Sequence, residues 1–141
     1  MAIIINAEGL VLGRMASKVA KTLLSGEKVE IVNAEKAVMS GSKPFILEKV
    51  RVKLARAPKS NPTKGPHISR MPDRMIRSAV RNMLPKYSTR GRKAFGNLRV
   101  WVGVPAALKN EKAETIENAK KDNFKKSMTI GEISRIQGAK F

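Results

Sequence analysis

The first third of the chain carries a strand–helix–strand pattern, which limits the possible folds more than any other feature of the sequence. Residues 2–6, AIIIN, form a short apolar run with β-branched isoleucines, as is typical of a strand buried on both faces. Residues 29–33, VEIVN, form a second such run, and Gly26 is placed to end a helix between the two. The apolar residues of this helix recur at helical spacing: Leu12, Ala16, Val19, Ala20 and Leu23. Two strands joined by a helix within about 30 residues predict a βαβ unit, and hence a parallel sheet with a right-handed crossover.

The middle of the chain predicts two more helices, separated by a loop. Residues 44–57 form the first helix, with an expected buried stripe of Leu47, Val50, Leu54 and Ala57. Residues 58–71 contain three prolines and no acidic residue, so we expect an extended, positively charged segment, here called the basic loop. Pro72 suits the first position of the next helix, whose expected apolar stripe is Ile76, Ala79, Val80 and Met83.

The remaining elements are shorter. A short run at 37–39, a basic turn at 86–93 (KYSTRGRK) and a final sheet strand at 98–102 (LRVWV) complete the expected body of the fold. Residues 113–126 are polar and fit either an exposed helix or an irregular segment. Thr129 and Glu132 have the spacing of a capping box ahead of Ile133 and Ile136, and Gly138 is placed as the stop.

Length and composition predict one ordinary domain. The 141 residues fit a single domain over 1–141, with the basic loop and a polar extension over about 106–141. Hydrophobic residues make up 42%, too many for a disordered basic tail. No apolar run approaches the ~20 residues that span a bilayer, and the start of the chain lacks the features of a signal peptide. The absence of cysteine excludes disulfides, thiolate metal sites and cysteine nucleophiles, and is compatible with a reducing cytoplasm.

The positive charge is concentrated in the middle of the chain. The net charge is +18, and residues 43–99 carry most of it, with sixteen basic against two acidic side chains. Concentrated like charge raises the self-repulsion of a folded domain unless a polyanion neutralises it, whereas evenly spread charge aids solubility. We therefore predict a nucleic-acid surface. A solvated basic face and an anionic membrane surface are the alternatives.

Arginine carries the predicted phosphate contacts, because its planar guanidinium binds phosphate oxygens bidentately. Arg74, Arg77 and Arg81 share the side of their helix that faces away from the apolar stripe. The other basic candidates are Arg14 and Lys18 of the first helix, Lys49, Lys53 and Arg56 of the second, Lys59, Lys64, His67 and Arg70 of the basic loop, and Lys86, Arg90, Arg92 and Lys93 of the basic turn. We expect the basic loop to be mobile in the free protein, because its prolines and like charges offer little packing.

The aromatic residues and motifs found near these basic residues indicate which kind of nucleic acid they bind. Aromatic residues are only 4% of the chain, and Tyr87 is the one within the basic run, so the surface suits the backbone and shape of folded RNA more than single strands. Charge alone does not exclude DNA, but no helix-turn-helix glycine turn and no basic region with heptads is present.

The sequence contains few residues that are placed as catalytic or cofactor-binding groups require. Gly9 and Gly13 bracket the first turn, but GLVLG is not G-x-G-x-x-G, and Gly13 is not followed by Lys-Ser/Thr. Glu30 is a weak candidate for a ribose acceptor, and His67 has no neighbouring carboxylate to orient it. Glu111, Glu114 and Glu117 could form a metal-binding face, but they lie among lysines without a histidine and are better interpreted as solvated. We expect no metal, cofactor or small-molecule substrate.

Three blocks of sequence carry a family resemblance. VLGRMASKVAKTLLSGEKVEIVNAEKAVMSG at 11–41, PDRMIRSAVRNMLPK at 72–86 and GRKAFGNLRVWVG at 91–103 closely resemble the universal large-subunit ribosomal protein thirteen family. Asn82 stands where many members have glycine. The segment RGRKAF and the closing TIGEISRIQG are similar to the archaeal branch, and the tail from Ala106 is less diagnostic.

The resemblance implies a fold and a function. The fold is a three-layer α/β/α arrangement with a four-stranded parallel sheet in the order 3214, Rossmann-like but without the nucleotide fingerprint. The function is non-enzymatic binding of large-subunit ribosomal RNA early in subunit assembly, beside neighbouring ribosomal proteins of the cytoplasmic ribosome. The residues that match the family's motifs are Arg14, Lys18, Ser40, Gly41, Lys43, Arg74, Arg77, Arg81, Lys86, Arg92 and Lys93. A nucleotide-binding enzyme on a Rossmann-like sheet and a DNA-compaction protein are the competing hypotheses.

Overall fold

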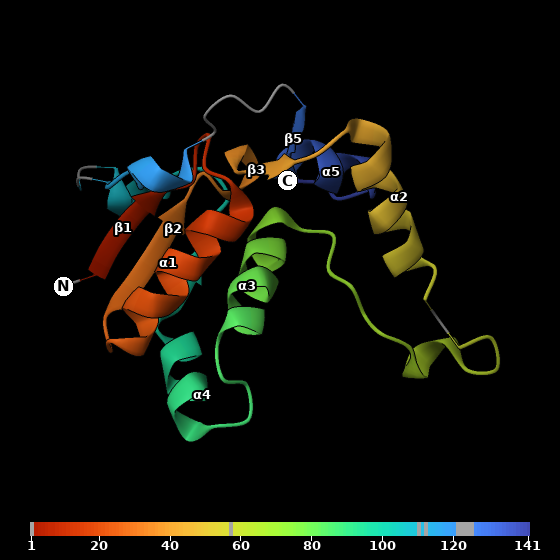
Figure 1. Cartoon of the computed structure of the whole chain (residues 1–141), viewed down its shortest axis with the longest axis horizontal. Helices are drawn as coiled ribbons and strands as arrows, with labels where there is room; N and C mark the ends of the chain where they lie inside the picture. Colours follow the sequence, from red (N-terminus) through yellow and green to blue (C-terminus); the bar gives the residue numbers. More distant parts are fainter. Residues whose placement is uncertain (1, 57, 110, 112, 121–125) are drawn as a thin grey trace.

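The computed structural model describes residues 2–56, 58–109, 111, 113–120 and 126–141. Its regular elements, in chain order, are β1 (Ala2–Asn6), α1 (Leu12–Leu24), β2 (Lys28–Val32), β3 (Val38–Ser40), α2 (Lys43–Leu54), α3 (Pro72–Met83), α4 (Thr89–Gly96), β4 (Leu98–Val100), β5 (Ser127–Thr129) and α5 (Ile130–Ile136). Figure 1 shows α1, α3 and α4 gathered beside the main sheet, while α2 and the basic loop extend to the other side of α3.

The predicted βαβ unit is present. β1 and β2 pair in parallel along their full length, with Ile5 opposite Ile31, and α1 connects them. The buried face of α1 consists of Met15, Ala16, Val19, Ala20 and Leu23, which matches the predicted stripe except that Met15 replaces the half-buried Leu12. Gly26 follows the helix with a φ of 96°, a left-handed conformation that favours glycine, so its predicted role as the stop is confirmed.

The predicted four-stranded sheet is present in part. The parallel sheet has three strands in the order β1-β2-β4, and counted from β4 these are the third, second and first strands of the predicted order 3214. At the outer edge of β1, where that order places the fourth strand, Glu114 forms a single parallel bridge to Ile5: Glu114 N donates to Ile4 O at 2.8 Å and Asn6 N donates to Glu114 O at 3.0 Å. β4 pairs with the other edge of β2, where Val29 lies opposite Leu98.

The short run at 37–39 becomes β3 but does not join this sheet. β3 pairs antiparallel with β5, Met39 lying opposite Met128, and touches the start of α1 through a bridge between Val11 and Val38. A strand of three residues offers few hydrogen bonds, and β3 forms them with a segment that lies far away in the sequence. This run therefore does not supply the predicted fourth parallel strand.

The helices that pack on the main sheet lie against one face. Ile5, Val29, Ile31 and Leu98 point toward that face and share a buried cluster with residues of α1 and α3. The opposite face carries the exposed Lys28 and Arg99 and the partly exposed Glu30, whereas Ile4 and Val32 on the same face are buried. In the part of the chain that the structure describes, this stretch of the sheet is open, and the implied second helical layer does not cover it.

The helix that begins at Pro72 is confirmed, and its end is corrected. Ile76 and Val80 of α3 are fully buried and Ala79 is half-buried, as predicted, but Met83 is 45% exposed. The helix ends at Met83, and the next residue, Leu84, takes the buried position in its place.

The predicted basic turn at 86–93 is largely a helix. α4 covers Thr89–Gly96, and the Ser88 hydroxyl accepts a hydrogen bond from Gly91 N at 3.1 Å as its N-cap. The sequence pattern hides this helix, because only Gly91 and Ala94 of its eight residues are buried.

A second, smaller hydrophobic cluster joins α2 to the end of the chain. It consists of Ile46, Met128 and Ile133. α2 is shorter than predicted, and its expected stripe is buried only in part: Leu47 and Val50 are half-buried and pack against this cluster, Leu54 is half-buried, and Ala57 lies outside the described residues. The predicted capping box of Thr129 and Glu132 is confirmed at the start of α5, where both reciprocal hydrogen bonds form. The described residues between 113 and 120 are irregular apart from a 3₁₀ turn at Glu117–Ala119.

Candidate nucleic-acid interface

The three predicted arginines of α3 form an exposed row. Arg74, Arg77 and Arg81 are exposed, on the side of the helix away from the buried Ile76 and Val80. The guanidinium carbons of Arg77 and Arg81 lie 5.2 Å and 5.8 Å from the centre of the Phe95 ring of α4. Cation–π attraction to one shared ring holds the two arginines beside each other. Sequence reasoning did not identify Phe95, because its role depends on how α4 folds back against α3.

The basic residues that follow α3 in the sequence lie on α4 and on the turn before it. Lys86, Arg90, Arg92 and Lys93 are all exposed. Arg90 Nη2 donates to the carbonyl oxygen of Leu24 at 3.3 Å, which ties α4 to the end of α1. We call Arg74, Arg77, Arg81, Lys86, Arg90, Arg92 and Lys93 together the α3–α4 cluster.

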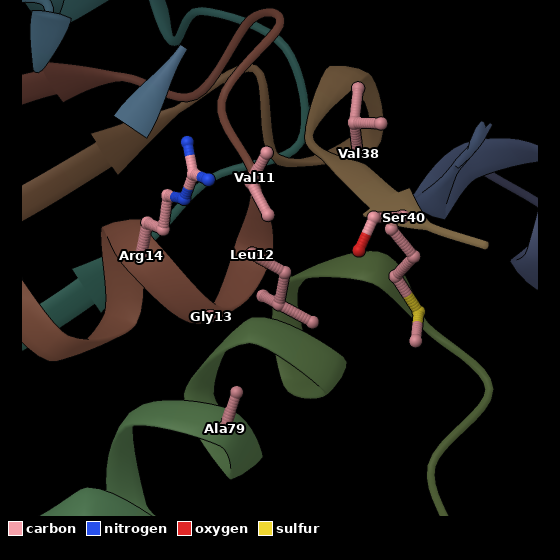
Figure 2. A pocket seen from close by; sticks show the side chains of 8 residues that line it. Val11, Leu12, Gly13, Arg14, Val38, Ser40 and Ala79 are labelled. Carbon is pink, nitrogen blue, oxygen red and sulfur yellow. The ribbon is translucent and has the colours of Figure 1, made fainter. Parts of the chain in front are cut away.

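The predicted residues of the first helix and of the segment after it meet at an open depression. Arg14 of α1, Ser40 of β3 and Ala79 of α3 line a hollow of about 460 Å³, and the side chain of Arg14 lies at its edge (Figure 2). Lys18 is exposed one turn farther along α1. Gly41 has a φ of 133°, a conformation that L side chains rarely adopt, and it leads into α2, where Lys43 is exposed.

A second group of basic residues lies on α2 and the basic loop, away from the helices of the main body (Figure 1). Its members, all exposed, are Lys49, Lys53, Arg56, Lys59, Lys64, His67 and Arg70. His67 Nε2 lies 3.1 Å from Thr63 O, a contact within the loop itself. Most of the predicted basic residues thus lie on two supports: the α3–α4 cluster, which is packed on the main body, and α2 with the basic loop.

The cations of the α3–α4 cluster are not neutralised by the carboxylates that the structure describes. Within that part of the chain, the salt bridge that forms joins Lys36 to Glu8 at 3.2 Å, and neither residue belongs to the predicted site. Arg74, Arg77 and Arg81 make no salt bridge to any described carboxylate. An excess of exposed positive charge on fixed helices favours association with a polyanion, because each phosphate neutralised releases condensed counterions.

The nucleotide-binding hypothesis loses support from the first turn. Two backbone amides of the turn before α1 are engaged within the fold: Val11 N donates to Ala119 O at 2.8 Å, and Gly9 N donates to Lys36 O at 3.3 Å. Glu30, the candidate ribose acceptor, accepts a hydrogen bond from Trp101 Nε1 at 2.9 Å. The described residues contain no group of three or more His, Cys, Asp or Glu side chains that could hold a metal ion.

Two residues of the block at 11–41 that carries the resemblance, Asn33 and Glu35, serve the fold. Asn33 adopts a left-handed conformation with a φ of 57°, and its side-chain amide donates to Asn6 Oδ1 at 2.9 Å. A carboxylate oxygen of Glu35 accepts a hydrogen bond from Gly103 N at 2.9 Å. These contacts connect the segment after β2 to the end of β1 and to the turn after β4, so we assign these residues a structural role.

Among the described residues, no helix is both long and apolar enough to cross a membrane.

Comparison with known proteins agrees with the motifs. The family model for ribosomal protein L13 matches residues 1–107. A large ribosomal subunit protein uL13 of Methanosphaera stadtmanae is 46% identical, with all of both chains covered. The proteins of the same name from Archaeoglobus fulgidus and Thermoplasma acidophilum are 44% and 36% identical, covering 96% of this chain and 86% and 97% of their own lengths. The chain therefore belongs to the ribosomal protein L13 family.

Proposed function

We propose that this protein is a structural constituent of the large ribosomal subunit, which binds folded large-subunit ribosomal RNA and supports early subunit assembly in the cytoplasm. It acts without catalysis, cofactor or small-molecule substrate, as a single domain beside neighbouring ribosomal proteins. The observation that carries the proposal is the α3–α4 cluster, an exposed set of cations on packed helices with no described carboxylate paired to its arginines. The names of the relatives point to the same assembly.

The two supports for the cations suit two parts of an RNA surface. The α3–α4 cluster is fixed by the packing of α3 and α4 on α1, so it fits RNA whose phosphates are already held in place by folding. The basic loop is exposed along most of its length and can adjust to the shape that it meets. Both contact the backbone rather than the base edges, and such contacts set position and affinity rather than sequence preference.

The experiment that tests this function is crosslinking inside assembled subunits. A tagged copy of the full chain, expressed in the organism that encodes it, should sediment with the large subunit in a sucrose gradient. Ultraviolet crosslinks between protein and RNA should map to α3, α4 and the basic loop, and not to Lys28 or Arg99 on the open sheet face. A chain that stays at the top of the gradient, or crosslinks confined to the open face, would overturn the proposal.

DNA binding is tested in the same protein preparation. Duplex DNA of equal length should compete with the ribosomal RNA transcript only weakly, because it lacks the folded shape that the fixed arginines fit. Equal competition by the duplex would favour the DNA-compaction hypothesis.

A further inference from the structure

Tyr87 is the most exposed of the large hydrophobic residues that the structure describes. Its side chain is 94% exposed, so both faces of the ring are open to solvent. The other aromatic of the same unit, Phe95, is half-buried and carries Arg77 and Arg81 over its ring. Phe95 therefore makes cation–π contacts with two arginines, whereas no cation of the described chain lies over the Tyr87 ring.

The turn that presents Tyr87 is held in place on both sides. Ser88 N and Ser88 Oγ each donate to Pro85 O at 3.2 Å, and Arg92 N donates to Ser88 O at 3.2 Å. Gly91 packs so closely against Pro85 that no side chain could be placed between them. The Cα of Tyr87 is thus fixed by the start of α4, although its ring is open to solvent. A ring on a fixed backbone loses less conformational freedom on binding than one on a loose loop.

Basic residues flank Tyr87 in the sequence. Lys86 precedes it directly, and Arg90 and Arg92 follow on the first turns of α4, all exposed. An uncharged aromatic face set among phosphate-binding cations is the arrangement that proteins use to stack an unpaired base while the cations hold its backbone.

On this basis we propose that Tyr87 is a stacking platform for one unpaired, turned-out nucleobase of the ribosomal RNA. The proposal rests on the proposed function and adds a non-electrostatic contact to a surface that otherwise binds phosphate. It also revises the expectation from composition, which assigned this surface to backbone and shape alone. The ligand is a base in a bulge, loop or junction, because a base inside a helix presents no free face.

The test compares Tyr87→Phe, Tyr87→Leu and Tyr87→Ala in the full chain, with a transcript of the complete large-subunit ribosomal RNA of the same organism as the probe. Filter binding at several salt concentrations gives the dissociation constant and its salt dependence. Tyr87→Phe keeps the ring and should bind within about twofold of the unaltered chain. Tyr87→Ala should bind roughly tenfold more weakly, as expected for the loss of one base–aromatic stack. The salt slope of both variants should stay the same, because no charge is removed.

Two further readouts make the result specific. Lys86→Gln, one residue away, should reduce the salt slope by about 0.7–0.9, in contrast to the unchanged slope of Tyr87→Ala. Chemical probing with dimethyl sulfate should show one base protected by the unaltered chain and by Tyr87→Phe, and exposed with Tyr87→Ala. Since the ring is exposed in the free protein, all three Tyr87 variants should unfold at the same temperature.

The outcomes separate this inference from the function on which it rests. If the unaltered chain shows no salt-dependent binding to the transcript, the proposed function itself fails. If that chain binds and Tyr87→Ala binds equally well, only the stacking platform is overturned. If Tyr87→Leu binds as tightly as the unaltered chain, the side chain acts as an aliphatic contact with the RNA, and stacking is overturned as well.

Discussion

Gly91 of α4 lies directly against the carbonyl oxygen of Pro85, and a Cβ added at Gly91 would overlap that oxygen. This contact allows the chain to turn from α3 into α4 within a few residues. It brings Phe95 under Arg77 and Arg81 and places the two helices of the proposed interface side by side. Glycine is required here for its lack of a side chain and not for its backbone angles, because its φ is not positive.

Gly91→Ala should therefore destabilise the protein. The clash is with backbone, which cannot move aside without displacing α4, and overpacking of this kind costs about 1–3 kcal/mol. Thermal unfolding followed by circular dichroism measures the effect. Gly96→Ala in the same helix is the matched control, since a Cβ there meets nothing within 4 Å. That variant should leave the free energy of unfolding unchanged or raise it by up to about 1 kcal/mol. Equal stability of the two variants would contradict the packing described here.

Replacing Arg74, Arg77 and Arg81 together by glutamine should weaken binding to the ribosomal RNA transcript while the fold survives, because all three are exposed. Each phosphate that is no longer neutralised lowers the slope of log K against log salt by about 0.7–0.9, so the slope of the triple variant should fall by roughly 2–3. Filter binding over a range of salt concentrations gives the slope. The double variant Lys28→Gln, Arg99→Gln removes charge from the open sheet face and should keep the slope. An unaltered slope in the triple variant would remove the α3 row from the interface.

Phe95 should be energetically coupled to Arg77. Exposed cation–π pairs contribute about 0.5–1 kcal/mol. A double-mutant cycle with Phe95→Leu and Arg77→Gln isolates that contribution from the packing of the ring, because leucine retains much of the apolar volume. Urea unfolding of the four proteins gives the coupling free energy. The same cycle with Arg74, which does not lie over this ring, should give a coupling near zero.

Thr129→Ala should loosen α5. The Thr129 hydroxyl accepts from Glu132 N at 3.2 Å, and loss of an N-cap costs about 1 kcal/mol. Because Ile130 and Ile133 of α5 are fully buried, the loss should appear in the global free energy of unfolding and not only at the helix end. Thr129→Ser keeps the hydroxyl and should retain most of the stability. Urea unfolding compares the two variants. Equal losses in both would mean that the cap contributes nothing.

Trypsin should cut the free protein first at Lys59 or Lys64. Both are exposed in the basic loop, whereas Lys18 and Lys21 lie within the hydrogen-bonded helix α1. Cleavage needs several residues to be drawn out of the structure, and this requires least opening where backbone hydrogen bonds and buried side chains are few. Mass spectrometry of the early fragments identifies the sites. Binding of the ribosomal RNA transcript should slow these cuts, and early cleavage inside α1 would contradict the prediction.

The elements that follow from neighbouring residues could be predicted from the sequence. The β1–α1–β2 unit, the start of α3 at Pro72 and the capping box at Thr129 all depend on residues within one or two turns of each other. The direction of Arg74, Arg77 and Arg81 follows in the same way, because helical periodicity alone separates them from Ile76 and Val80.

The elements that depend on contacts between residues far apart in the sequence could not be predicted. At the outer edge of β1, where the order 3214 places a fourth strand, Glu114 forms only a single parallel bridge to Ile5, and no local pattern in the sequence reveals this. β3 is a strand because β5 pairs with it, and three residues carry too weak a pattern to reveal that pairing. In the interface, neither the helix α4 nor the role of Phe95 has a periodic signal, since both arise from the tight contact between Gly91 and Pro85.

The antiparallel pairing of β3 with β5 also bears on the order in which the polypeptide matures. Translation delivers β3 and α2 long before Met128 and Ile133, the two residues that complete the cluster around Ile46. Until those late residues emerge, the nascent protein can assemble β1, β2 and α1, while α2 has no finished hydrophobic surface to dock against. The segment that positions the basic loop can thus settle only after Met128 and Ile133 have been synthesised, so this part of the RNA-binding surface is placed later than the one on α3 and α4.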